Sequence, residues 1–111
     1  MTTPALPTVI DTYQRAHDQR DTDTAITTFR PNATVIDEDT TFSGTEHIRR
    51  WLTHAASEYT YTRTLTGVDH LDDGVYIVHN HLSGDFPGSE VDLRYRFELR
   101  DNLIHHLTIA P

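Results

Sequence analysis

Residues 90–100 alternate between apolar and charged side chains over their whole length. The apolar set is Val91, Leu93, Tyr95, Phe97 and Leu99, and the charged set is Asp92, Arg94, Arg96, Glu98 and Arg100. Successive side chains of a β-strand point to opposite faces, so this spacing predicts a strand with one buried and one charged face. A strand of this kind is stable only when it pairs with other strands, so we expect an antiparallel sheet whose apolar face is covered by the rest of the chain.

The rest of the chain divides into helices first and strands last. Pro7 suits the first turn of a helix that runs to about Arg20, and Asp21-Thr22-Asp23 offers N-cap residues for a second, shorter helix. A third amphipathic helix is expected from Thr45 to about Ser57. The predicted strands are residues 33–37, 40–43 (a strand or a turn), 59–68, 75–83, 90–100 and 103–109, with turn signals at 67–74, 84–88 and 101–102. This order predicts an α+β fold, a single domain over residues 1–111 with its helices on one face of the sheet.

Composition excludes several classes of function. The chain of 111 residues has a formal net charge of -8, which disfavours nucleic-acid and anionic-membrane partners. It has no cysteine, so thiolate chemistry is excluded. No signal peptide is recognisable and no apolar run approaches the ~20 residues that span a bilayer, so we expect a cytoplasmic protein.

Five short motifs recur in the order expected for one known superfamily. They are Asp21 with Ala25, Ile26 and Phe29; Ala33-Thr34-Val35-Ile36-Asp37; Gly44-Thr45-Glu46-His47-Ile48 with Trp51; Leu65-Thr66-Gly67; and Phe97-Glu98-Leu99-Arg100-Asp101-Asn102-Leu103-Ile104. The chain resembles the nuclear transport factor 2-like superfamily, which includes ketosteroid isomerases and SnoaL-type polyketide cyclases. The resemblance covers nearly the whole chain. It implies a cone in which a curved antiparallel sheet wraps around the N-terminal helices and leaves an internal cavity, and a homodimer joined through the outer sheet face.

The same resemblance implies roles for three residues. Asp37 corresponds to the general base of ketosteroid isomerases, and Tyr13 to the tyrosine that donates a hydrogen bond to the developing enolate. Tyr95 stands where those enzymes carry a protonated aspartate as the second donor. The tyrosine that they carry on the third helix is Leu52 here. Both departures argue against steroid isomerisation itself.

The residues themselves leave alternatives open. A carboxylate in a pocket wall has a raised pKa suited to proton abstraction, but Asp37 precedes Glu38 and Asp39, and three acids together are typical of an exposed turn. Tyr13 lies on the apolar stripe of its helix and is also explained as a core tyrosine. His17, one turn further, either shuttles protons or lines the cavity wall.

Further residues are expected to border the cavity and bind a ligand: His17, Trp51, Tyr61, Arg63, Tyr76 and His105. A buried Arg63 would need an acidic partner, either Asp37 or a substrate carboxylate, and at the rim it would reach water instead. The strand at 75–83 does not reveal whether His79 and His81 face the cavity or the surface. Their spacing alone does not define a metal site, and we expect none.

The sequence therefore predicts a SnoaL-like protein that acts without a cofactor on a small hydrophobic carbonyl compound, as an isomerase, cyclase or dehydratase. Asp37 would move the proton, and Tyr13 and Tyr95 would stabilise the enolate oxygen. The competing hypothesis is a non-catalytic module for ligand binding or dimeric assembly, because one fold supports unrelated functions.

Overall fold

The computed structural model describes residues 6–54 and 60–111, and within them the chain forms three helices and six strands. The elements are α1 (Thr8–Asp18), α2 (Thr22–Thr27), β1 (Phe29–Asp37), β2 (Thr40–Ser43), α3 (Thr45–Thr53), β3 (Tyr61–Asp72), β4 (Val75–Gly84), β5 (Glu90–Arg100) and β6 (Leu103–Ala110). The α+β class is confirmed. The predicted end of the third helix near Ser57 lies outside the described residues.

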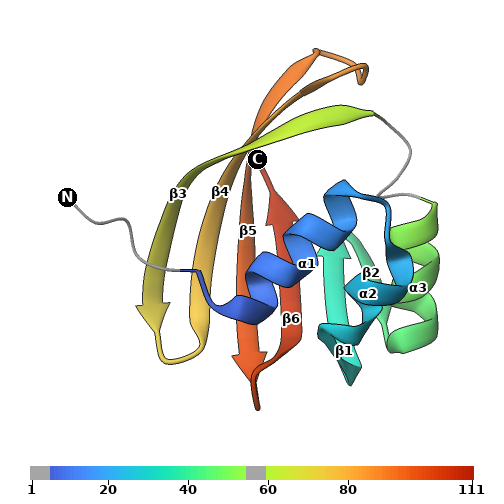
Figure 1. The fold of residues 1–111 in the computed structure, drawn as a ribbon, viewed down its shortest axis with the longest axis vertical. Helices are drawn as coiled ribbons and strands as arrows, with labels where there is room; N and C mark the ends of the chain where they lie inside the picture. Colours follow the sequence, from blue (N-terminus) through green and yellow to red (C-terminus); the bar gives the residue numbers. More distant parts are fainter. Residues whose placement is uncertain (1–5, 55–59) are drawn as a thin grey trace.

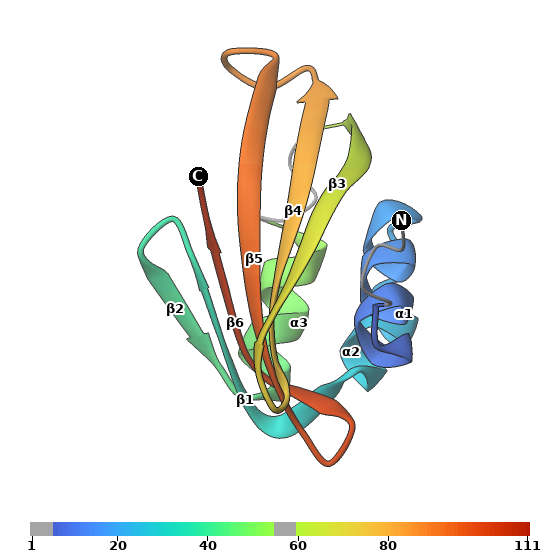
Figure 2. The same cartoon turned by 90° about the vertical axis from the view of Figure 1, so that its left-hand side faces the viewer.

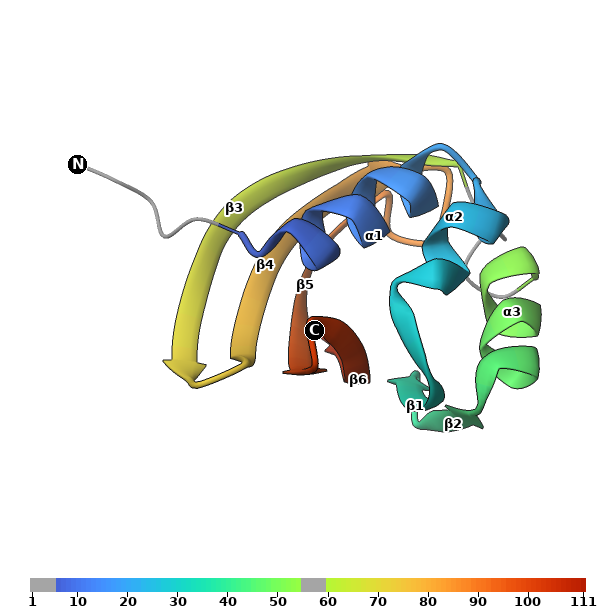
Figure 3. The same cartoon turned by 60° about the horizontal axis from the view of Figure 1, so that its bottom comes forward.

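The strands form one curved sheet in the order β2-β1-β6-β5-β4-β3. The last four form the predicted antiparallel meander, whereas β1 pairs in parallel with β6. The sheet does not close, since β2 and β3 are free edges. Figure 1 shows α1 crossing in front of the sheet, Figure 2 shows α1 and α2 on one side of it, and Figure 3 shows β3 and β4 curving around α1.

The alternation of residues 90–100 determines which face of the sheet is buried. Tyr95 and Phe97 are 5% and 0% exposed and pack in the core with α1, while Arg94 is exposed on the outer face. Val78 pairs with Tyr95, so β4 continues the same buried face. The helices therefore cover the concave side of the sheet, as the sequence indicated.

Capping and turn residues fix the ends of the elements that surround the concave face. Of the three N-cap candidates at 21–23, Asp21 is the one that caps α2, because its carboxylate accepts a hydrogen bond from Thr24 N at 3.1 Å. Glu38 and Asp39 have φ values of 50° and 62° and form a tight turn between β1 and β2. This turn holds Asp37 at the end of β1, where it pairs with Thr40.

Two predicted boundaries are wrong. Gly67 was expected to open a turn, but β3 continues through it to Asp72, and a register shift between Leu65 and Gly67 marks a bulge there. The strand predicted at 33–37 begins earlier, at Phe29, and includes Pro31. Its pairing with β6 is irregular between Phe29 and Thr34, where a proline, which has no N–H group to donate, is tolerated.

Candidate functional site

A pocket of about 630 Å³ lies among α1, α3 and the strands of the curved sheet. Its lining comes from α1, the end of β1, α3, β3, the β4–β5 hairpin and β6. The lining residues are Tyr13, His17, Ile36, Asp37, Glu38, Asp39, Trp51, Tyr61, Leu82, Phe86, Pro87, Glu90, Val91, Leu93, Tyr95, Thr108, Ile109, Ala110 and Pro111. Its size is within the range of small-molecule sites.

Six of the nine residues singled out from the sequence line this pocket: Asp37, Tyr13, Tyr95, His17, Trp51 and Tyr61. Arg63, Tyr76 and His105 are not part of its lining. The pocket therefore brings together the three residues expected to act on a proton or an enolate, although they lie far apart in the sequence.

Asp37 is held by the indole of Trp51. The Nε1–H group of Trp51 donates a hydrogen bond to Oδ2 of Asp37 at 3.0 Å, and Trp51 itself is 2% exposed. No other side-chain hydrogen bond to this carboxylate is found in the described part of the chain. The indole thus fixes one oxygen and leaves the other available at the pocket wall.

Tyr13 combines deep burial with an unused polar group. It is 1% exposed, and its hydroxyl has no hydrogen-bond partner among the described residues. Burial, reinforced by the neighbouring Tyr95, raises the pKa of Tyr13 well above its usual value, so the phenol stays protonated. An unpaired buried hydroxyl is costly, and such groups are expected where a ligand or an ordered water supplies the missing partner.

Tyr95 lines the same pocket from β5 and is 5% exposed. Burial is the main cause that raises the pKa of Tyr95, and nearby Tyr61 and Asp37 raise it further. The pocket therefore holds two phenols that remain neutral hydrogen-bond donors at physiological pH.

His17 forms a neutral pair with Tyr61. The Tyr61 hydroxyl and Nε2 of His17 share a hydrogen bond of 2.8 Å. Burial lowers the pKa of His17 to about 4, and the positive charge of Arg20 adds to this effect. The imidazole is accordingly uncharged at neutral pH, and burial also raises the pKa of Tyr61.

Three aromatic rings connect α1 to α3 in the wall of the pocket. Tyr13 and His17 stack with centroids 6.0 Å apart, and His17 stacks on Trp51 at 6.3 Å. Trp51 also donates a hydrogen bond to Asp37, so the position of this carboxylate depends on how the stacked rings pack α1 against α3.

Arg63 has a structural partner different from those considered from the sequence. Its guanidinium forms an ion pair with Asp18 at 2.8 Å, rather than with Asp37, and donates to Oδ1 of Asn80 at 3.1 Å. Asn80 in turn donates to Gln14 Oε1 at 2.9 Å. The suggestion that Asp37 neutralises Arg63 is wrong, because the acid at the end of α1 is nearer.

Tyr76 and His105 also have surroundings other than the pocket. Tyr76 stacks on His70 with centroids 4.3 Å apart and packs against the core. His105 falls at the register irregularity between Leu99 and Glu98 in the β5–β6 pairing, where its Nδ1 is buried without a partner among the described residues.

His79 and His81, whose direction the sequence left open, lie on the outer face of the sheet. His79 contacts Asp69 at 2.7 Å, and His81 contacts Asp92 at 2.7 Å and Glu90 at 3.1 Å. Hydrogen bonds to Asp92 and Glu90 raise the pKa of His81. Within residues 6–54 and 60–111, no group of three or more suitable side chains is placed to bind a metal ion.

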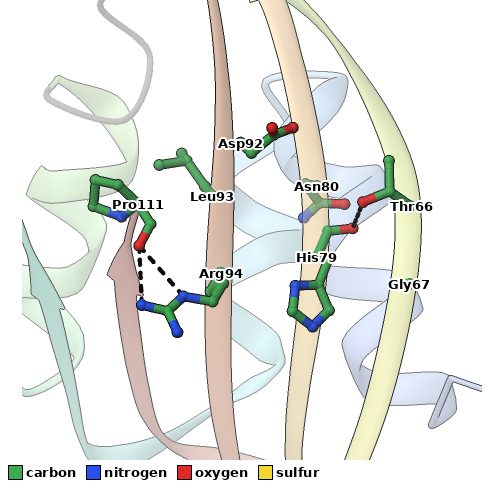
Figure 4. Close-up of a pocket in the computed structure, with 8 residues that line it drawn as sticks. All are labelled: Thr66, Gly67, His79, Asn80, Asp92, Leu93, Arg94 and Pro111. Atoms are coloured by element: carbon green, nitrogen blue, oxygen red, sulfur yellow. Dashed lines mark hydrogen bonds between the residues drawn. The ribbon is translucent and has the colours of Figure 1, made fainter.

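A second depression lies over β3, β4 and β5 (Figure 4). Its lining includes His79 and Arg94, and Arg94 donates to the carbonyl oxygen of Pro111 at 3.1 Å. It contains neither of the buried phenols nor Asp37, so the concave pocket is the candidate active site.

The sequence did not identify the β4–β5 hairpin as part of the site. Phe86 and Pro87, in the turn of this hairpin, contribute to the pocket lining. An aromatic residue between Gly84 and Gly88 is unusual for a turn that faces water, and this feature of the sequence could have indicated that the hairpin contacts a pocket.

No family model matches the sequence, and no curated protein matches it. No helix in the described part of the chain has the length and apolar character needed to cross a membrane.

The solved structures give a clear result. A Sinorhizobium meliloti protein with the provisional name polyketide cyclase is 34% identical, with a TM-score of 0.87 over 95% of each chain. A Catenulispora acidiphila protein of ketosteroid isomerase-like fold, solved in complex with trimethylamine, is 17% identical, with a TM-score of 0.81 over 99% of this chain and 87% of that one. A nuclear transport factor 2-like protein from Cytophaga hutchinsonii is 11% identical, with a TM-score of 0.76 over 99% of this chain and 93% of the other. The chain belongs to the nuclear transport factor 2-like superfamily and is a SnoaL-like protein.

Proposed function

We propose that this chain is a cytoplasmic, cofactor-independent enzyme that enolises a small hydrophobic carbonyl compound in the concave pocket. One observation carries the proposal. Asp37 and Tyr13 line the same pocket, and the Tyr13 hydroxyl has no hydrogen-bond partner among the described residues. Isomerisation, aldol-type cyclisation and dehydration all pass through such an enolate, so the proposal covers these three reactions.

The proposed step needs only residues of the pocket. The Asp37 carboxylate takes a proton from the carbon next to the carbonyl, and the C–H electron pair becomes the C=C bond of the enolate. Tyr13 and Tyr95 donate hydrogen bonds to the oxygen on which charge develops. The Trp51 N–H group orients the base. Returning the proton to a different carbon completes an isomerisation. In a cyclisation the enolate carbon attacks a second carbonyl, whose oxygen takes the proton from Asp37. In a dehydration the enolate expels a β-hydroxyl group, which leaves as water with that proton.

Three of the similar structures support a small-molecule site. The polyketide cyclase name belongs to a protein that shares 34% identity over almost the whole chain. The protein of ketosteroid isomerase-like fold was solved in complex with trimethylamine, and a cyanobacterial carotenoid protein that binds canthaxanthin matches this chain over 36% of its own length, which supports binding of a small ligand here.

Exchange of α-protons for deuterium tests the proposal directly. Small aryl ketones would be incubated with the protein in D₂O and followed by NMR. We expect exchange with the wild type, loss to background with Asp37→Asn, and a loss of about 10²-fold with Tyr13→Phe, as is typical of removing one oxyanion donor. Asp73→Asn is the matched control, because Asp73 lies in the exposed β3–β4 turn.

The alternative function is non-catalytic ligand binding. Apolar side chains such as Leu82, Leu93 and Ile109 line the same pocket and would bind a hydrophobic ligand without reacting with it. Binding by the wild type without exchange on any enolisable ketone would favour this alternative. The single tryptophan, Trp51, makes the indole N–H signal a specific report of binding beside Asp37.

We also propose a homodimer joined through the outer sheet face, where Arg94, Arg96 and His81 lie. Light scattering would give twice the monomer mass. A monomer at micromolar concentration would refute this part of the proposal.

A further inference from the structure

The charges in the pocket lining are all of one sign. Its charged residues are Asp37, Glu38, Asp39 and Glu90, and among the residues that the structure describes the lining contains no arginine or lysine. His17 does not compensate, because burial lowers its pKa to about 4 and leaves it neutral at pH 7. A ligand that enters the pocket therefore meets acidic side chains and no cationic partner.

The nearest cations have other partners. Arg63 forms its ion pair with Asp18 at 2.8 Å and is not part of the lining. Arg20 lies with its guanidinium carbon 5.3 Å from the centre of the Tyr61 ring, also outside the lining. Both guanidinium groups are thus already in contact with groups of the protein.

The four acidic residues of the lining differ in whether their carboxylates already have a partner in the protein. Asp37 is bonded to Trp51, and Glu90 is in contact with His81 on the outer face at 3.1 Å. Glu38 and Asp39 are exposed and have no ion pair within the described ranges. These two carboxylates in the β1–β2 turn are the ones available to a charged group of a ligand.

The deeper lining has the opposite character. Tyr13, Leu82 and Tyr95 are buried, and all line the pocket. The unpartnered Tyr13 hydroxyl indicates that this deeper part also receives a polar atom of the ligand. The lining thus combines an apolar region, one unused hydrogen-bond donor and an acidic turn.

We infer that the natural ligand carries a positively charged amine, protonated or quaternary, beside an apolar body that bears the carbonyl group. The amine lies at Glu38 and Asp39, and the apolar body packs against Leu82 and Tyr95. This inference rests on the proposed function, since it names the substrate class of the same site. It predicts weak binding of carboxylated and phosphorylated substrates, for which the lining as described offers no arginine or lysine.

Three ketones of nearly the same shape separate the effect of charge from that of size. They are 4-acetyl-N,N,N-trimethylanilinium, the neutral 4-tert-butylacetophenone and the anionic 4-acetylbenzoate. Binding would be measured at low salt from the Trp51 indole N–H signal, which is unique because the chain has one tryptophan. We expect the cation to bind at least about tenfold more tightly than its neutral isostere, a difference that two nearby carboxylates can supply in partly screened surroundings, and the anion not to bind.

A matched pair of double variants tests where the preference originates. Glu38→Gln with Asp39→Asn should reduce the preference to about threefold or less, while binding of the tert-butyl ketone is retained. Asp72→Asn with Asp73→Asn makes the same change in net charge at the exposed β3–β4 turn and should leave the preference intact.

Three results would overturn the inference. They are equal or tighter binding of the neutral ketone, no binding of the cation at millimolar concentration, and an equal effect of the two double variants, which would assign the preference to the overall charge of -8. Deuterium exchange on the same ketones separates the two proposals. Exchange without a preference for the cation refutes this inference alone, whereas that preference without exchange refutes the enzymatic proposal and leaves the ligand class supported.

Discussion

Replacing Tyr13 with phenylalanine should stabilise the free protein. Tyr13 is 1% exposed and its hydroxyl has no partner among the described residues, so the folded state carries the cost of a buried, unpaired hydroxyl. That cost is about 1–3 kcal/mol. The void left by one oxygen atom costs only about a few tenths of a kcal/mol in return. We therefore expect the free energy of unfolding to rise by about 1–2 kcal/mol.

The measurement is urea unfolding of wild type and Tyr13→Phe, with thermal unfolding alongside. A gain of 1 kcal/mol corresponds to a rise of about 4 °C or more in Tm for a domain of this size. The denaturant m-value should not change, because the substitution leaves the compactness of both states unaltered.

Tyr61→Phe is the matched control, since it makes the same chemical change in the same pocket. The Tyr61 hydroxyl is bonded to His17 Nε2 at 2.8 Å, and its loss leaves the ring nitrogen without that partner. This variant should be destabilised by about 1 kcal/mol. If Tyr13→Phe is destabilised to a similar extent, the Tyr13 hydroxyl has a partner in solution and is not a free donor for a ligand.

Two further predictions follow from the same structure. The pKa of His17 is about 4 in the folded protein against an ordinary 6.5, so the unfolded chain binds more protons between these two pH values. The free energy of unfolding should therefore be highest above about pH 6.5 and should fall by about 3 kcal/mol as the pH drops towards 4. Urea unfolding across this range should show a flatter profile for His17→Gln, and identical profiles would contradict the assignment. Gly84→Ala should cost about 2–3 kcal/mol, because a Cβ there would overlap the Thr60 carbonyl oxygen and the Tyr61 backbone. Gly88→Ala, where a Cβ meets no atom within 4 Å, should cost only the left-handed backbone penalty of about 1–2 kcal/mol, and an equal loss in both variants would show that the overlap relaxes.

The sequence predicted best those features that depend on local periodicity. Residues 90–100 form β5 with the boundaries expected from their alternation, and the Asp21 cap lies where a side-chain acceptor precedes a short helix. Gly67 was misinterpreted because glycine is typical of turns and also of bulges. Here Gly67 lies at the bulge of β3, and an added Cβ would make only an ordinary contact with the His79 ring at 3.6 Å.

The resemblance to the superfamily located most of the pocket, but the pairing of its residues depended on contacts across the fold. Arg63 and Asp18 are separated by 45 positions, and no local pattern distinguishes Asp18 from Asp37 as the partner. The bond between Tyr61 and His17 depends likewise on how β3 curves over α1. Sequence patterns indicate which face a residue occupies, whereas such pairings depend on the curvature of the sheet.

The pocket takes its lining from nearly every element, from α1 to the final residues of β6. No partly folded form that lacks the sheet or the helices can therefore present it. Ligand binding and global folding are then thermodynamically linked, and a ligand at a hundredfold excess over its Kd should raise the unfolding free energy by about 2.7 kcal/mol. Resistance of the whole chain to proteolysis would consequently report occupancy of the pocket, so that a substrate can be sought by its protection of the fold before any reaction is known.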